Sequence, residues 1–299
     1  MIKIKKALRN IKYKFEYYLK KKLPIKNREG YISKIYMKRI GHQLDWKNLK
    51  TYTEKMQYSK LYDINELKVK LTDKIAVRDW VANKIGKEYL IPLLGIYSRP
   101  EEIDYDMLPS KFVIKTNHGS GTNIIVRDKS KIDINKINKK LNVWINQDFS
   151  YISCFEMHYS SITPRIMVEQ LIETPNNDLQ DYKFLCFNSK VYYCWVDTGR
   201  YTDHKRSIYN LDWELQPFNQ YNYNNAEVEK PKNFDQMVKI AEKLCKGFSH
   251  VRVDLYNVSG KIYFGEMTFT NGGGFEKIIP EKYDRILGDL WNIDINYNT

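Results

Sequence analysis

Two acidic residues near the C-terminal end of the chain, Asp254 and Glu266, are spaced in a way that suits a divalent cation. They lie in two runs, residues 251–256 and 262–268, in which apolar and polar side chains alternate with the period of two that is typical of β-strands. Turn-forming residues at 257–260 predict that the two runs pair as a hairpin. Mg²⁺ is commonly held by one or two carboxylates together with substrate phosphates, so the hairpin is a candidate magnesium site.

The register of this hairpin decides how the two carboxylates meet. If Asp254 faces Phe264 and Glu266 faces Arg252, the carboxylates are diagonal neighbours on one face, roughly 7–8 Å apart at their Cα atoms. Because the two charges repel each other, replacing either residue by its amide is expected to leave stability almost unchanged. The alternative interpretation is a solvated hairpin face, where acidic residues are ordinary.

A second candidate site is a loop rich in glycine, serine and threonine at residues 116–123. It lies between two apolar runs, 111–115 and 124–126, and the first of them ends in Lys115. Glycines let successive backbone N–H groups turn toward a phosphate, and a lysine adds a mobile positive charge. The alternative is a plain hairpin turn, since neither the dinucleotide-binding nor the P-loop signature is present.

The order of the motifs along the chain resembles one known family. Asp73-Lys74 comes first, followed by Lys115 and its loop, the run 167–172, the segment 181–184 and the acidic hairpin. This succession resembles the ATP-grasp enzymes. The chain is most similar to the TupA-like ATP-grasp group, which is found with teichuronopeptide and capsular polysaccharide biosynthesis. The similarity is carried by two sequence segments, DYKFLCFNSKVYY and VRVDLYNVSGKIYFGEMTFTNGGG. The resemblance covers roughly residues 70–290.

The resemblance implies a role for each motif. Adenine would be bound by Glu169, Gln170, Leu171 and Ile172. Lys115 and Lys183 would neutralise phosphate oxygens, and the loop residues His118, Gly119, Ser120, Gly121 and Thr122 would cover them. Lys74 and Asp181 would also belong to the nucleotide-binding site. Lys183, Arg200 and Arg252 would be the catalytic residues, and the two arginines would stabilise charge on the transferring γ-phosphoryl group. Mg²⁺ would be held by Asp254, Glu266 and Thr268. Glu169 and the two arginines could equally be structural ion-pair partners.

The chain departs from the family pattern at the metal site. Many ATP-grasp enzymes carry an asparagine two residues after the metal-binding glutamate, whereas here that position is Thr268 and the next asparagine is Asn271. The number of metal ions is therefore open. The glycines at 272–274 would permit a close backbone approach to substrate, or else form a flexible connection.

The remaining pattern predicts an α+β protein with an ATP-grasp fold, in which two lobes with mainly antiparallel sheets grip ATP. We expect a basic helical region at 1–70 and an ATP-grasp domain at 71–299, with lobes at approximately 71–165 and 166–299. Helices are predicted at 73–85, 133–147, 233–248 and 280–290. Strands are predicted at 90–97, which should be buried, and at 166–172, 182–187, 191–196 and 207–215.

The positive charge is concentrated in the first quarter of the chain. The whole chain has a net charge of +13, and residues 1–70 carry 20 Lys and Arg against 6 Asp and Glu, so the remainder is close to neutral. Within this region Ile4, Leu8, Ile11, Phe15 and Leu19 fall at helical spacing among many lysines, before Pro24. Such a helix suits an anionic membrane surface, with residues 1–22 making the contact, or it packs on the domain with a solvated basic face.

Composition narrows the class of protein. Apolar residues make up 42% and charged residues 28%, as in soluble globular chains, and no apolar run is long enough to cross a membrane. The N-terminus lacks the pattern of a secretory signal. The four cysteines show no zinc-ligand spacing and are expected to be free thiols in a reducing cytosol. No nucleic-acid-binding signature accompanies the basic segment, so no nucleic-acid partner is expected.

These observations predict a cytoplasmic enzyme, peripheral on the inner face of the membrane if the N-terminal helix binds lipid. ATP and Mg²⁺ would activate a carboxylate as an acyl phosphate, which an amine then attacks. The resemblance implies that an amino acid is joined to a uronic acid or peptide of a surface polysaccharide. The alternatives are an ATP-grasp kinase, a noncatalytic scaffold protein, and a glycosyltransferase that would use Asp104-Tyr105-Asp106 as its metal-binding motif.

Overall fold

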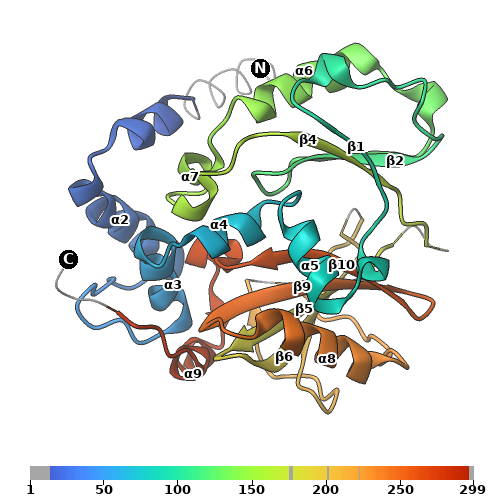
Figure 1. Ribbon diagram of the computed structural model, residues 1–299. Coiled ribbons are helices and arrows are strands. Elements are labelled where there is room, and N and C mark those ends of the chain that lie inside the picture. The colour runs from blue at the N-terminus through green and yellow to red at the C-terminus, as the bar shows by residue number, and fades with distance from the viewer. Residues whose placement is uncertain (1–13, 175–177, 201, 222, 296–299) are drawn as a thin grey trace.

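The computed structural model describes residues 14–174, 178–200, 202–221 and 223–295 (Figure 1). Two antiparallel sheets form the centres of two lobes, and helices cover them from outside. The mixture of helices with antiparallel sheets confirms the predicted α+β class. In the described part of the chain, no helix has the length and apolar character needed to span a bilayer.

The smaller sheet has four strands in the order β1-β4-β2-β3. Their bounds are Leu93–Tyr97 for β1, Phe112–Thr116 for β2, Asn123–Val126 for β3 and Ile166–Gln170 for β4. Helix α6 (Ile134–Ile145) begins after Asp133, whose side chain accepts the Lys136 N–H, and packs Ile137 and Leu141 on this sheet. The prediction that residues 90–97 form a buried strand was wrong in part, because β1 is an edge strand with exposed leucines at 93 and 94.

The larger sheet has five strands in the order β10-β9-β5-β6-β7. Their bounds are Asp181–Phe187 for β5, Lys190–Thr198 for β6, Lys205–Tyr209 for β7, His250–Val258 for β9 and Lys261–Thr268 for β10. Helices α5 (Val77–Ile85) and α8 (Phe234–Cys245) cover one face, where Met237, Ile240, Ala241 and Leu244 are buried as their helical spacing predicts. The strand predicted at 207–215 ends at Tyr209, because a turn follows.

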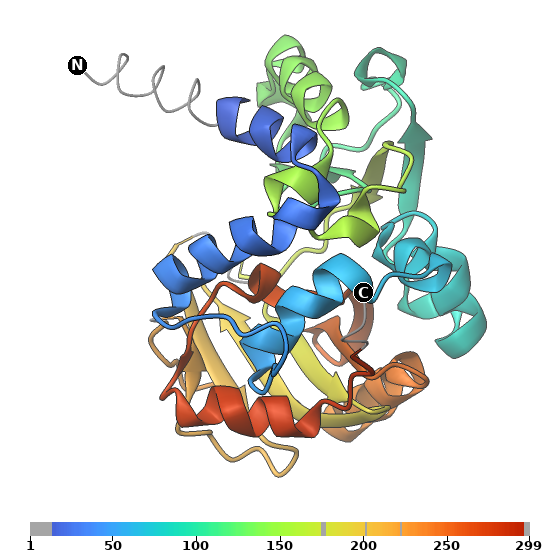
Figure 2. The ribbon, with the colours of Figure 1, turned by 90° about the vertical axis from the view of Figure 1, so that its left-hand side faces the viewer.

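The opposite face of the larger sheet is divided in two. One half is apolar and is covered by α3 (Tyr52–Tyr62) and α9 (Lys282–Leu290) (Figure 2), with Trp195, Phe187 and Ile208 buried beneath them. The other half carries charged side chains and faces the smaller sheet. The apolar half anchors the strands, so that the charged half is presented on a rigid support.

Helices of the N-terminal region connect the two lobes (Figures 1 and 2). The first described helix covers residues 14–22, and it is followed by η1 (Ile25–Asn27), α2 (Arg28–Ile40), α3 and α4 (Glu66–Thr72). Helix α5 begins at Val77 and not at Asp73, because Asp73 accepts the Ile75 N–H in a separate turn. The remaining elements are α7 (Phe149–Ile152), β8 (Asn219–Gln220), β11 (Ile278–Ile279), η2 (Lys87–Tyr89), η3 (Pro100–Glu102), η4 (Lys129–Lys131), η5 (Met157–Tyr159) and η6 (Asn271–Gly274).

Candidate active site

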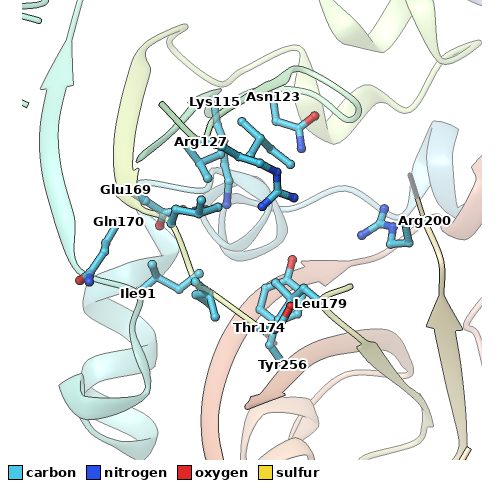
Figure 3. Close-up of a pocket in the computed structure, with 14 residues that line it drawn as sticks. Ile91, Lys115, Asn123, Arg127, Glu169, Gln170, Thr174, Leu179, Arg200 and Tyr256 are labelled. Carbon is cyan, nitrogen blue, oxygen red and sulfur yellow. Dashed lines mark hydrogen bonds and ion pairs between the residues drawn. The ribbon is translucent and has the colours of Figure 1, made fainter. Parts of the chain in front are cut away.

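Two adjoining hollows lie between the sheets. The first, with about 690 Å³ of empty volume, has a largely apolar wall and is drawn in Figure 3. The second, with about 1000 Å³, is a polar cleft. Lys115, Asn123, Arg200 and Tyr256 line both. Figure 3 places Lys115 and Glu169 on the side of the smaller sheet, with Tyr256 and Arg200 across the gap from them.

The apolar hollow lies against the end of β4, and its walls suit a flat ring. Its apolar lining comes from Ile91, Val113, Ile125, Leu171, Ile172 and Leu179. The four residues predicted to bind adenine, Glu169 to Ile172, all line it. Buried Glu169 accepts from Lys115 Nζ at 2.7 Å and from Arg78 Nη1 at 3.0 Å. Arg78 was not anticipated, because it lies on α5, far from Glu169 in sequence.

The glycine-rich loop joins β2 to β3 and forms one wall of the polar cleft. Its tip, Gly119 to Thr122, lines the cleft, and Gly121 has the positive φ of +71° that glycine tolerates best. Lys74 also lines the cleft, and its Nζ donates to the Gly119 carbonyl at 2.6 Å. His118 is outside the cleft: it is buried and directed to the Gln147 carbonyl, 3.0 Å away, and burial lowers its pKa. The loop is therefore tied down at its base, while its glycine tip faces the cleft.

The strand register collects charges on the facing half of the larger sheet. Lys183 on β5 lies opposite Asp254 on β9, and Asp181 lies opposite Asp197 on β6. Asp254 is engaged at both oxygens, by two 2.7 Å hydrogen bonds from Arg252 and one of 2.8 Å from Lys183. Lys183 also contacts Asp181. Lys183 and Arg252, which were predicted as catalytic residues at the phosphates, are thus buried partners of carboxylates and do not line the cleft.

A β-bulge at Gly265 sets the position of Glu266. The hairpin register predicted from the sequence was wrong: Glu266 pairs directly with Asp254, and the register shifts between Phe264 and Glu266. If side chains alternated without interruption from Phe264, which packs in the core on the other face, Glu266 would also point to that face. A Cβ at Gly265 would lie 3.0 Å from the Asp254 carbonyl oxygen, so glycine suits the close approach. The bulge therefore delivers the second carboxylate to the cleft.

Glu266 is surrounded by donors. It accepts from Arg252 Nη2 at 3.2 Å and from Thr268 Oγ1 at 3.0 Å, and Lys74 Nζ lies 3.9 Å away. Burial acts to raise the pKa of Glu266, but Lys74, Arg252 and Lys183 outweigh it and hold the pKa at about 2. Thr268 does not line the cleft, and Asn271 bonds to Arg252 instead of reaching toward Glu266. Glu266 is accordingly ionised at neutral pH and presented to the cleft.

The acidic side chains fit a hard cation. Asp181, Asp254 and Glu266 all line the cleft, and the buried Oδ1 of Asp181 has no hydrogen-bond partner. Its Oδ2 accepts from Arg200 Nη1 at 2.7 Å. In the described ranges, no three His, Cys, Asp or Glu side chains are gathered closely enough to hold a metal unaided. The donors are therefore of the kind that Mg²⁺ prefers, with phosphate oxygens needed to complete its shell.

The three glycines after Asn271 form a buried turn. Gly272, Gly273 and Gly274 have φ of +57°, +59° and +69°. Helix α3 holds this turn from behind, with Gln57 Nε2 donating to the Gly274 carbonyl at 2.7 Å and Lys60 Nζ to the Gly273 carbonyl at 3.0 Å. The turn lines neither hollow. In this structure the turn is a packed connection, and it is not placed to make the predicted close backbone approach to a substrate in either hollow.

Sequence reasoning missed two side chains of the cleft, Tyr256 and His204. The period-two pattern that places Asp254 on the cleft face also places Tyr256 there, so that signal was available. His204 lies in the loop before β7, where no periodicity applies. Asp104-Tyr105-Asp106 is a turn in which the Asp104 carboxylate accepts the Asp106 N–H, and it lines neither hollow.

Two antiparallel sheets that enclose such a paired hollow define the ATP-grasp class of protein. Residues 54–292 match the model of the family described as TupA-like ATPgrasp, and the chain belongs to that family. No match was found among curated proteins.

Solved structures resemble the chain in fold. D-alanine–D-alanine ligase from Bacillus anthracis with ATP is 17% identical, with 67% of this chain and 54% of that chain covered and a TM-score of 0.37. L-amino acid ligase from Bacillus licheniformis is 12% identical, with 77% and 51% covered and a TM-score of 0.45. A RimK domain ATP-grasp protein from Sphaerobacter thermophilus is 11% identical, with 81% and 78% covered and a TM-score of 0.43. The chain spans about half the length of the first two.

Proposed function

We propose that the protein is an ADP-forming carboxylate–amine ligase. The observation that carries this proposal is the apolar hollow that opens directly into a polar cleft lined by both cations and carboxylates. Adenine fits the first hollow, and the phosphate chain fits beside Lys115, Lys74 and the glycine tip of the β2–β3 loop. Phosphoryl transfer depends mainly on positioning and electrostatic stabilisation, which such a cleft can supply.

Each lining group has a task in this proposal. Lys115 and Lys74 neutralise phosphate oxygens from one wall, and Arg200 stabilises the transferring phosphoryl group from the other. Lys183 and Arg252 act indirectly, because they fix the Asp254 carboxylate. Glu266, Asp254 and the free oxygen of Asp181 would hold Mg²⁺, which when bound polarises the phosphoryl oxygens. A carboxylate oxygen of the acceptor attacks the γ-phosphorus, giving an acyl phosphate and ADP.

The acyl phosphate is then attacked by an amine, with release of phosphate. We propose that an amino acid is joined to a uronic acid, or to a peptide, of a surface polysaccharide. Membership of the TupA-like family supports this choice. The residues of the cleft support the nucleotide more strongly than they support the acceptor.

The reaction can be tested by trapping its intermediate. With ATP, Mg²⁺ and uronic-acid oligosaccharides but no amine, added hydroxylamine should give a hydroxamate. With a panel of amino acids instead, ADP and phosphate should form in step with an amide. A phosphorylated product without free phosphate would establish a kinase, and activity with a sugar nucleotide a glycosyltransferase. Release of AMP and pyrophosphate would refute the acyl phosphate, and no turnover at all would favour a scaffold.

We also propose that the N-terminal helix contacts an anionic membrane. Within residues 14–22, Tyr17 and Lys20 face α7: the Asp148 N–H donates to the Tyr17 hydroxyl, and Lys20 Nζ donates to the Ile152 carbonyl. The outward stripe is apolar and exposed, with Phe15 at 63%, Tyr18 at 55% and Leu19 at 48%. Residues 1–13, which carry the rest of the predicted stripe, lie outside the described residues. An apolar stripe flanked by lysines suits the interface of an anionic bilayer.

Sedimentation with phosphatidylserine vesicles tests this contact. The double replacement Phe15→Ser and Leu19→Ser should reduce binding, and binding of the unaltered chain should weaken as salt is raised. Met107→Ser is the matched control, because Met107 is 82% exposed but lies in the turn after η3, away from the N-terminal helix. Equal sedimentation of all three chains would show that the stripe does not bind lipid.

A further inference from the structure

His204 lines the polar cleft and has no role in the phosphate and metal contacts described above. It lies just before β7, on the side of the cleft away from the adenine hollow: it lines the polar cleft only, whereas Lys115 and Arg200 line both. A molecule that meets the γ-phosphate end of the nucleotide would therefore pass beside it.

A buried carboxylate orients the ring. His204 Nε2 is buried and lies 3.4 Å from Asp197 Oδ1, without the geometry of a hydrogen bond. Asp197 is itself 1% exposed and is fixed by Arg206, which donates to its two oxygens at 2.6 and 2.8 Å. The ring of Tyr223 packs against the His204 ring with the centroids 4.5 Å apart. The imidazole is thus held between an aromatic ring and an anion.

This arrangement selects one tautomer. A carboxylate beside Nε2 favours the form that carries its proton on Nε2, which leaves the lone pair on Nδ1. The contact lacks hydrogen-bond geometry in this structure, and catalytic hydrogen bonds are often poorly aligned before substrate binds and tighten afterwards. Because the Nε2 edge is turned to Asp197, the Nδ1 edge is the part of the ring that can accept a proton from a molecule in the cleft.

Among the described residues that line the cleft, the other candidates for a proton acceptor are poorly suited. Lys74, Lys115 and Arg200 are cations, and the carboxylates of Asp181, Asp254 and Glu266 each accept from a cation. Histidine is the side chain that exchanges a proton most readily near neutral pH.

We propose that His204 is the general base for the amine in the ligation step, an inference that rests on the proposed ligase function. Nδ1 takes one proton from the ammonium group of the amino acid, and the neutral amine that results attacks the acyl carbon. As the C–N bond forms, the bond between the acyl carbon and the phosphate oxygen breaks, and inorganic phosphate leaves with the electron pair and with the second proton of the nitrogen. The imidazolium that results lies beside the Asp197 carboxylate and returns its proton to water.

A comparison of two nucleophiles, hydroxylamine and an amino acid, distinguishes a general base from a residue with a structural role. Hydroxylamine is unprotonated near neutral pH and needs no base, whereas an amino acid arrives as an ammonium ion. In the full-length chain, His204→Gln keeps a polar group near Asp197 but removes the base. It should leave hydroxamate formation from uronic-acid oligosaccharides unchanged and slow amide formation on the order of a hundredfold. Equal losses in both reactions, or no loss in either, would overturn the inference.

A second measurement needs no substrate. Diethyl pyrocarbonate acylates accessible, unprotonated imidazoles, and mass spectrometry locates the product. His204 should react, as should His42 on the surface, whereas His118, His158 and His250 are at most 3% exposed and should not. A resistant His204 would overturn the inference even if ligation is found. If the unaltered chain forms neither hydroxamate nor amide, the ligase function itself fails, and a reactive His204 would then remain an accessible cleft residue without this role.

Discussion

The two carboxylates of the candidate metal site should respond very differently to replacement by their amides. Asp254 is 2% exposed and accepts from both Arg252 and Lys183, so Asp254→Asn leaves two buried cations short of a partner. Removing one member of a buried ion pair costs about 3–5 kcal/mol of unfolding free energy. The Glu266 side chain is 34% exposed, and its contacts to Arg252 and Lys74 are 3.2 and 3.9 Å. For Glu266→Gln we therefore expect a loss of at most about 1 kcal/mol.

Both replacements should abolish ATP turnover, because each removes a charged oxygen donor from the cleft. Urea unfolding followed by fluorescence measures the change in unfolding free energy, and ADP release per folded molecule measures ATP turnover. Asp284→Asn is a suitable control, since Asp284 is as buried as Asp254 and bonds to Thr53 outside the cleft. It should lower stability and keep turnover. Equal and small stability losses at 254 and 266, as the sequence alone suggests, would refute the reasoning from the Arg252–Asp254–Lys183 contacts.

Three further outcomes are expected. Lys115→Ala should weaken ATP binding roughly tenfold and AMP binding much less, because the lysine faces the phosphate cleft. Calorimetry measures both affinities, and equal losses would show that Lys115 serves only as the structural ion-pair partner of Glu169. Gly274→Ala should cost about 3 kcal/mol and Gly121→Ala about 1 kcal/mol: both have positive φ, but only at Gly274 would a Cβ meet Gln57, 2.3 Å away. Burial lowers the pKa of His158 and of His250 to about 3, so the unfolded chain binds more protons and stability falls as pH drops from about 6.5 toward 3. At pH 5 each histidine should cost about 2 kcal/mol in urea unfolding, and His158→Gln should remove one such share; a pH-independent midpoint would contradict this.

Local pattern was sufficient to predict most elements and the positions of several cleft residues. The period of two in residues 251–256 and 262–268 identified β9 and β10, and the glycines at 119 and 121 identified the β2–β3 loop. The stripe of Met237, Ile240 and Leu244 identified α8. These features depend on neighbours in sequence, so sequence is enough to find them.

The rest depends on contacts between distant segments. The bulge at Gly265 cannot be read from alternation, because it is an interruption of that pattern imposed by the partner strand. Lys183 and Arg252 were expected at the phosphates, but both donate to Asp254 instead. The local sequence around these two residues does not indicate this shared partner. Arg78 reaches Glu169 from another lobe. His118 stands among loop residues that face the cleft, yet a carbonyl at the end of α6 draws it away.

The alternating charges on the facing half of the larger sheet also limit how this protein can change over generations. Arg252, Asp254, Lys183 and Asp181 follow one another across β9 and β5, and all four are buried. Reversing the charge of any one of these residues would place like charges side by side. A substitution at one position should therefore be tolerated only together with a compensating substitution at its partner. Among related chains, positions 183 and 254 should therefore either stay fixed or vary together, whereas the exposed lysines of the N-terminal helix should be free to move along it.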